Sequence, residues 1–99
     1  MTVALRIDER RLADFCRRNR IRRLSLFGSV LRDDFGPDSD VDVLVEFEPS
    51  AVVTLLDMVR MEMELSEMIG RKADLRTPED LSRYFREQVV ASAVVQYAG

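Results

Sequence analysis

The sequence predicts an α/β fold in which helices cover a small β-sheet. Three short apolar segments, at residues 22–27, 41–47 and 72–76, are typical of strands. Between and after these segments, apolar residues recur every three or four positions, as in helices that bury one face. Strands interleaved with helices define an α/β layer architecture, and the pattern leaves strand order and direction open. A chain of 99 residues is long enough for one compact domain, so we expect a single domain over residues 1–99.

The N-terminal segment predicts a helix followed by a strand. Asp8 suits an N-cap, and we expect the helix to end near Asn19. One face of this helix carries three apolar residues, Leu12, Phe15 and Cys16. The thiol is therefore interpreted as part of the core rather than as a nucleophile. In the strand at residues 22–27, Leu24 and Leu26 share one face.

A short connection is expected between the first two strands. Residues 29–33 predict a short helix, and residues 35–39 predict a loop because they contain Gly36-Pro37. The second strand is expected at residues 41–47, and Pro49 follows its end.

A long helix is expected from a cap at Ser50 to about Ile69, with Gly70 as its C-terminal stop. One apolar stripe consists of Val52, Leu56, Val59 and Met63, and it is broadened by Leu55, Met58, Leu65 and Ile69. Four methionines, Met58, Met61, Met63 and Met68, fit adaptable core packing. The alternative is that part of this apolar surface exceeds what one sheet covers and contacts another protein.

The C-terminal part predicts a third strand and a last helix. The strand covers residues 72–76. Thr77 and Pro78, followed by two acidic residues, are a typical helix start. We expect this helix to continue to the end of the chain, because apolar or small residues recur at helical spacing at Leu81, Phe85, Val89 and Ser92.

The composition fits an ordinary folded protein, with 46% hydrophobic and 33% charged residues. No apolar run is as long as a membrane span, and the N-terminus has no signal-peptide pattern. The single cysteine excludes an internal disulfide and fits a reducing compartment, so we expect a cytoplasmic protein without membrane contact. Because the chain contains no histidine, acid–base or metal chemistry must fall to carboxylates.

The net charge of −3 is unevenly distributed along the chain. Acidic residues gather between Asp33 and Asp42, and a basic cluster consists of Arg17, Arg18, Arg20, Arg22 and Arg23. The simpler interpretation of the arginines is a solvated helix end, where cations are favourable. The alternative is a patch for phosphates or for an acidic partner. The negative net charge argues against direct binding of nucleic acid.

A glycine-serine turn and a pair of aspartates are the most informative features. Gly28-Ser29 closes one predicted strand, and Asp40 and Asp42 open the next, with ten residues between the two motifs. Because side chains alternate along a strand, the two aspartates project to the same side. Two carboxylates on one face suit Mg²⁺, and a turn that opens a helix suits a phosphate. Arg32, one turn further on, can reach the same anion.

This combination fits nucleotidyl transfer, in which a triphosphate is held, its charge is neutralised by Mg²⁺ and a hydroxyl is aligned with the phosphorus. We expect a third carboxylate from a neighbouring strand, and Asp74 is the best candidate. The alternative for Asp74 is a structural aspartate paired with Lys72 or Arg76. The alternative for the first two aspartates is an acidic turn before an edge strand. The spacing does not fit an EF-hand loop, and there is no Walker lysine motif.

These motifs resemble the signature of the DNA polymerase beta-type nucleotidyltransferase superfamily. So short a chain is similar to the minimal nucleotidyltransferases, or MNT proteins. The matching segments are residues 26–29, Arg32, residues 39–45 and residues 73–75, and the likeness extends from the first helix to residues 94–98. The resemblance implies a nucleotidyltransferase-like fold, with a small mixed sheet flanked by helices.

The resemblance also implies roles for individual residues. The implied catalytic and metal-binding residues are Asp40, Asp42 and Asp74, with Asp74 in the third acidic position. The implied nucleotide-binding residues are Gly28, Ser29, Arg32 and Ser39. Where the family often has a small residue before the arginine and a glycine after it, this chain has Leu31 and Asp33.

Minimal nucleotidyltransferases are commonly antitoxins paired with HEPN-domain toxins, which are ribonucleases. The resemblance therefore implies Mg²⁺-dependent transfer of AMP from ATP to a tyrosine of such a toxin, and a homo- or hetero-oligomer is compatible with it. One alternative is an antitoxin that neutralises its partner by binding alone. Another is a nucleotidyltransferase that acts on a small molecule or an RNA end.

Overall fold

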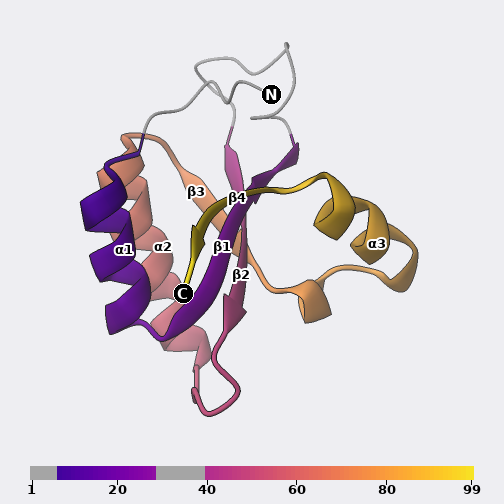
Figure 1. The fold of residues 1–99 in the computed structure, drawn as a ribbon, viewed down its shortest axis with the longest axis horizontal. Coiled ribbons are helices and arrows are strands. Elements are labelled where there is room, and N and C mark those ends of the chain that lie inside the picture. Colours follow the sequence, from indigo (N-terminus) through magenta and orange to yellow (C-terminus); the bar gives the residue numbers. More distant parts are fainter. Residues whose placement is uncertain (1–6, 29–39) are drawn as a thin grey trace.

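Four strands form one mixed sheet in the computed structural model, which describes residues 7–28 and 40–99 (Figure 1). The strands lie in the order β3-β2-β1-β4. They cover Ile21–Phe27 (β1), Val41–Phe47 (β2), Ala73–Arg76 (β3) and Val94–Ala98 (β4). β1 is antiparallel to both of its neighbours, whereas β2 and β3 are parallel. The expected small mixed sheet is confirmed.

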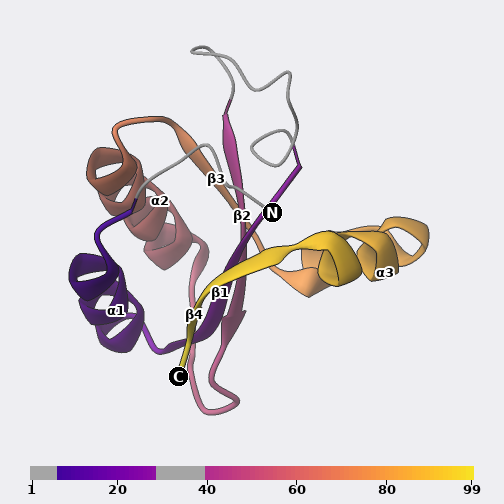
Figure 2. The ribbon, with the colours of Figure 1, turned by 45° about the horizontal axis from the view of Figure 1, so that its top comes forward.

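Helices lie on both faces of the sheet. α1 (Glu9–Arg18) and α2 (Leu55–Ile69) cover one face, and α3 (Arg83–Ser92) lies on the other (Figures 1 and 2). The α/β fold class is therefore as predicted. None of the helices in the described part of the chain has the length and apolar character needed to cross a membrane.

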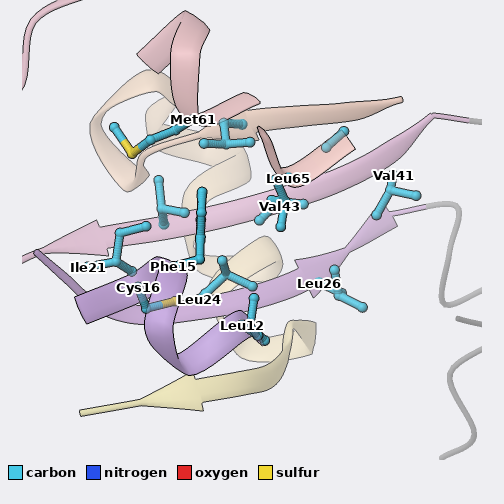
Figure 3. Packing of buried hydrophobic residues seen from close by; sticks show 13 residues of the cluster. Leu12, Phe15, Cys16, Ile21, Leu24, Leu26, Val41, Val43, Met61 and Leu65 are labelled. Atoms are coloured by element: carbon cyan, nitrogen blue, oxygen red, sulfur yellow. The ribbon is translucent and has the colours of Figure 1, made fainter. Parts of the chain in front are cut away.

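The first helix begins and ends where the sequence predicts. The Asp8 carboxylate accepts hydrogen bonds from the backbone N–H groups of Arg10 and Arg11, at 3.0 and 3.2 Å. The helix ends at Arg18, and its predicted face is buried through Leu12, Phe15 and Cys16 (Figure 3). Burial raises the pKa of the Cys16 thiol to about 12, so this group stays protonated and packs as an apolar side chain.

The two central strands divide their side chains between the faces as the alternation predicts. Leu24, Leu26 and Val43 point into the main core beneath α1 and α2 (Figure 3). Phe27 and Leu44 lie on the opposite face, in a smaller cluster with Val89 of α3. The main core therefore lies on one face of the sheet, and the other face is only partly filled.

The second helix starts later than expected. α2 begins at Leu55, where Thr54 and Asp57 form a capping box: the Thr54 hydroxyl accepts from the Asp57 N–H and the Asp57 carboxylate from the Thr54 N–H. The Ser50 hydroxyl instead accepts a hydrogen bond from Arg20 at 3.0 Å. The predicted stop is confirmed, since Gly70 adopts the left-handed conformation with φ +77°.

The apolar stripe expected on this helix does not face the core. Met61 and Leu65 are the buried residues of α2. The residues of the predicted stripe are largely exposed, at 89% for Val52, 68% for Leu56, 48% for Val59 and 67% for Met63. The prediction is therefore wrong about which face of α2 packs on the sheet. The helix has two apolar faces, and the face with Met61 and Leu65 is the one that contacts the sheet.

The expected continuous last helix is also wrong. Thr77 and Pro78 open only a short 3₁₀ turn at Pro78–Asp80, in which the Asp80 carboxylate accepts from the Thr77 N–H at 3.1 Å. The backbone is then extended at Leu81, and α3 begins after Ser82. After α3 the chain forms β4, whose valines favour a strand and which pairs with β1.

The basic cluster lies among acidic residues on the surface. Arg18 contacts Glu64 at 2.6 Å, Arg20 contacts Glu48 at 3.4 Å, and Glu46 lies 3.5 Å from Arg23. Because these pairs are exposed to solvent, they contribute little to stability. The exposed positions of these arginines fit the simpler interpretation of the cluster, a solvated helix end, and the ion pairs add to it.

Candidate active site

The turn after β1 brings Gly28 against Asp42. The last residue of β1, Phe27, is the register partner of Asp42 on β2. Gly28 has φ +76°, and a Cβ at this position would overlap the Oδ2 of Asp42 and lie 3.2 Å from its Cγ. Any larger residue would therefore meet both backbone strain and the carboxylate. The close approach explains why glycine stands here.

Asp74 lies beside Asp42 on the neighbouring strand. The parallel pairing of β2 and β3 makes the two aspartates register partners. Both are partly buried, whereas Asp40 is exposed one residue before β2 begins. Asp74 thus stands on the strand next to that of Asp42, and its role as the third carboxylate of the site stays a prediction. The two aspartates lie on the face of the sheet that α3 covers.

Asp74 also has a cationic neighbour. The Arg76 guanidinium lies 3.1 Å from the Asp74 Oδ2, so the ion pair expected under the structural alternative is present. Arg76 is half-exposed and can also approach an anion in the same place. Lys72, the other candidate partner, contributes a backbone hydrogen bond between the two strands: its carbonyl accepts the N–H of Val41 at 2.8 Å.

A cleft of about 530 Å³ opens between these carboxylates and α3. Its floor is formed by Gly28, Asp42, Asp74 and Arg76, and the α3 side provides Leu81, Phe85, Gln88, Val89 and Ser92. The helical spacing of most of these α3-side residues was visible in the sequence, but their place over the carboxylates was not. Gln88 carries no local signal, and only the fold places it in the cleft.

The donor chemistry of this site fits Mg²⁺. Asp42 and Asp74 offer hard oxygen atoms from adjacent strands, and Mg²⁺ usually keeps several ligands as water or phosphate. Across residues 7–28 and 40–99, no three acidic or thiol side chains form a ready metal-binding group. Asp42 and Asp74 are therefore suited to hold Mg²⁺ beside further ligands from phosphate and water.

Several predicted site residues lie outside the described residues. These are Ser29, Arg32 and Ser39, together with the expected short helix at residues 29–33 and the loop at 35–39. Of the predicted site, the described structure brings together Gly28, Asp42 and Asp74, and Asp40 stands two residues before Asp42, outside the residues that line the cleft.

The sheet, the glycine turn and the two adjacent carboxylates define the class of enzymes that transfer nucleotidyl groups. The model of the nucleotidyltransferase domain family matches residues 9–96, and the chain belongs to this family. It is accordingly a nucleotidyltransferase, and the match covers nearly all of the 99 residues.

Two curated relatives are about one-third identical to the chain over the aligned residues. MJ0435 of Methanocaldococcus jannaschii, a candidate protein adenylyltransferase, is 31% identical over 87% of this chain and 90% of its own length. The protein adenylyltransferase MntA of Thermococcus cleftensis is 32% identical over 75% of this chain and 73% of its own length. The chain is therefore similar to named protein adenylyltransferases along most of its length.

Solved structures agree with the fold. A candidate minimal nucleotidyltransferase superposes with a TM-score of 0.72 at 35% identity, covering 87% of this chain and 86% of its own. An MNT antitoxin in complex with a tri-AMPylated HEPN toxin of Shewanella oneidensis superposes with a TM-score of 0.65 at 19% identity, covering 92% and 70%. The second likeness concerns the fold alone.

Proposed function

We propose that this chain is the antitoxin of a toxin–antitoxin pair and transfers AMP from ATP to a tyrosine hydroxyl of a HEPN-domain toxin. The observation that carries the proposal is the pairing of Asp42 with Asp74 next to Gly28, at the floor of a cleft large enough for a nucleotide. The relatives named as protein adenylyltransferases support a protein acceptor. The AMPylated HEPN toxin held by a similarly folded antitoxin supports the partner.

The carboxylates would act as the metal-binding groups of the site. Asp42 and Asp74 would hold Mg²⁺, and Asp40, two residues before Asp42, would be the third metal-binding carboxylate. Bound Mg²⁺ would neutralise phosphate charge as the pyrophosphate leaves. The acceptor oxygen would bond to the α-phosphorus while the bond from that phosphorus to the bridging oxygen breaks. The hydroxyl proton would pass to the Asp74 carboxylate or to water.

The rest of the cleft would position the nucleotide. Gly28 has no side chain, so a phosphate would approach its backbone, while the space that a Cβ would take belongs to the Asp42 carboxylate. On the opposite wall, Phe85 and Leu81 offer apolar surface for a base, and Gln88 offers both a hydrogen-bond donor and an acceptor. The cleft is thus polar where phosphates would lie and apolar where a base would lie.

The decisive experiment measures labelling of a purified HEPN-domain partner with α-³²P-ATP and Mg²⁺. We expect Asp42→Asn to lower the labelling rate by at least about 100-fold, because a metal ligand is worth several kcal/mol to the transition state. Asp14→Asn is the matched control: Asp14 is exposed and pairs with Arg18 far from the cleft, so labelling should be unchanged.

The labelled residue and the bound complex separate the remaining outcomes. Mass spectrometry should place the AMP on a partner tyrosine. Equal labelling by wild type and Asp42→Asn would refute a catalytic role for the pair. If both proteins bind and inhibit the toxin without labelling it, the binding-only antitoxin is the correct function.

A further inference from the structure

A second and larger groove, of about 710 Å³, lies on the other side of Asp74. It runs along the β3 edge of the sheet, between the first turns of α2 and the 3₁₀ turn at Pro78–Asp80. Asp74 and Arg76 line both this groove and the cleft beneath α3. One carboxylate of the candidate active site is therefore reached from two separate hollows.

The groove continues into an exposed apolar surface on α2. We call this surface the α2 apolar patch, and it consists of Val52, Leu55, Leu56, Val59 and Met63. At 100° per residue, the four helical members span about 100° of the helix circumference, and Leu55 and Val59 also line the groove. Leu55 is 83% exposed. A contiguous patch of this kind marks a contact site.

The groove is acidic, and its acids are held in place. Glu62, Asp74 and Asp80 line it, against a single cation, Arg76, among the described residues. The Glu62 carboxylate accepts the N–H of Leu75 at 3.0 Å, which fixes its position. A ligand of this groove should therefore combine apolar side chains with positive charge.

The ligand is not expected to add a strand to the sheet. Along β3 the N–H of Leu75 is taken by Glu62, and the N–H of Ala73 donates to the Ser66 hydroxyl at 2.9 Å. The edge amides are thus occupied by side chains of α2. Recognition must come from side chains that fill the groove and cover the α2 apolar patch.

We propose that the groove and the α2 apolar patch dock the segment of the partner protein that carries the acceptor hydroxyl. That segment is apolar and basic, and it presents the hydroxyl to Asp74 while the nucleotide occupies the cleft beneath α3. This inference rests on the proposed function and adds the route by which the acceptor enters. A second copy of the chain is a poorer occupant, because each copy carries a net charge of −3.

The test compares three substitutions of valine or leucine by glutamate in the full chain. Leu55→Glu and Val59→Glu place a charge in the patch, and Val90→Glu is the matched control, since Val90 is 47% exposed on α3 and outside both hollows. We expect kcat/KM for the HEPN-domain partner to fall at least about tenfold for the patch variants, with affinity for a fluorescent ATP analogue within about twofold of wild type. Val90→Glu should change neither.

A fourth variant tests the charge of the groove. Glu62→Gln keeps an acceptor for the Leu75 N–H and removes the negative charge. Binding of the partner, measured by calorimetry, should weaken about two- to fivefold and depend less on salt concentration. Unchanged affinity and unchanged salt dependence would contradict a basic ligand.

The outcomes distinguish this inference from the proposed function. If wild type binds the partner without labelling it, and Leu55→Glu abolishes binding while Val90→Glu does not, the transfer reaction and the acceptor role of the docked segment are wrong, whereas the partner contact at the α2 apolar patch is correct. If the Leu55→Glu and Val59→Glu variants label the partner with the same kcat/KM as the Val90→Glu variant, the proposed docking site is wrong. It is equally wrong if the partner binds no form of the chain, or if light scattering shows that the patch variants only break a homodimer.

Discussion

The two faces of the sheet differ in how completely they are packed. Toward α1 and α2 the main core is closed, and Phe15 is fully buried at its centre. Toward α3 the described buried cluster contains three residues, Phe27, Leu44 and Val89. The remaining space on that face is the cleft that holds Asp42 and Asp74. The fold thus concentrates its stability on one face and leaves the other open for charged groups.

The largest effect on stability should come from a cavity in the main core beneath α1 and α2. Phe15→Ala is expected to lower the free energy of unfolding by about 3–5 kcal/mol, because it leaves a cavity in a fully buried site. Urea denaturation measures this loss. Phe85→Ala on α3 is the control on the open face: its side chain is 53% exposed, and the loss should stay below about 1.5 kcal/mol. Similar losses for the two variants would contradict the difference between the faces.

A smaller stability effect with a large effect on activity is expected on the open face. Gly28→Ala and Gly70→Ala both place a side chain at a left-handed position, with φ of +76° and +77°, and each should cost about 1–3 kcal/mol. The added Cβ meets Asp42 at Gly28 and meets nothing within 4 Å at Gly70. Labelling of the partner should therefore fall about 100-fold only for Gly28→Ala. Equal activity of the two variants would show that the close approach to Asp42 does not matter.

The smallest expected effect is the pH dependence of stability that comes from the buried Cys16 thiol in the main core. The folded-state pKa of Cys16 is about 12, against an ordinary value of 9.0, because burial disfavours the thiolate. Stability from this group is complete below pH 9 and is lost as the pH rises toward 12. We expect a loss of about 1.4 kcal/mol between pH 8 and pH 10 from this group. Urea midpoints at both pH values measure it, and the loss should shrink in Cys16→Ala; an unchanged pH dependence would mean that the thiol is not sealed from water.

Features that depend on a few neighbouring residues could be predicted from the sequence. The Asp8 cap, the strand at Val41–Phe47 and the stop at Gly70 are all confirmed. The start of α2 could also have been found: Asp57 stands three residues after Thr54 and completes a capping box, whereas Val53 stands three residues after Ser50 and cannot. Of the two possible N-caps, Ser50 and Thr54, the second therefore starts the helix.

Features that depend on distant parts of the chain could not be predicted in this way. β4 forms because β1 offers it an open edge, and the paired residues Leu26 and Val94 are far apart in the sequence. In the candidate site, the position of Asp74 beside Asp42 was predicted from strand patterns, and its catalytic role stays a prediction. The placement of α3 over these carboxylates needed the complete fold, because helical spacing does not say which face a helix covers.

The occupied edge of β3 has a consequence for the solution behaviour of the protein. An open sheet edge can template growth by further strands and so seed aggregates, and natural proteins protect such edges. Here Glu62 and Ser66 already take the N–H groups of Leu75 and Ala73, so growth from this side would first require α2 to give up these bonds. In the described sheet the other edge is β4, and any fibrillar or intermolecular strand pairing should therefore begin there.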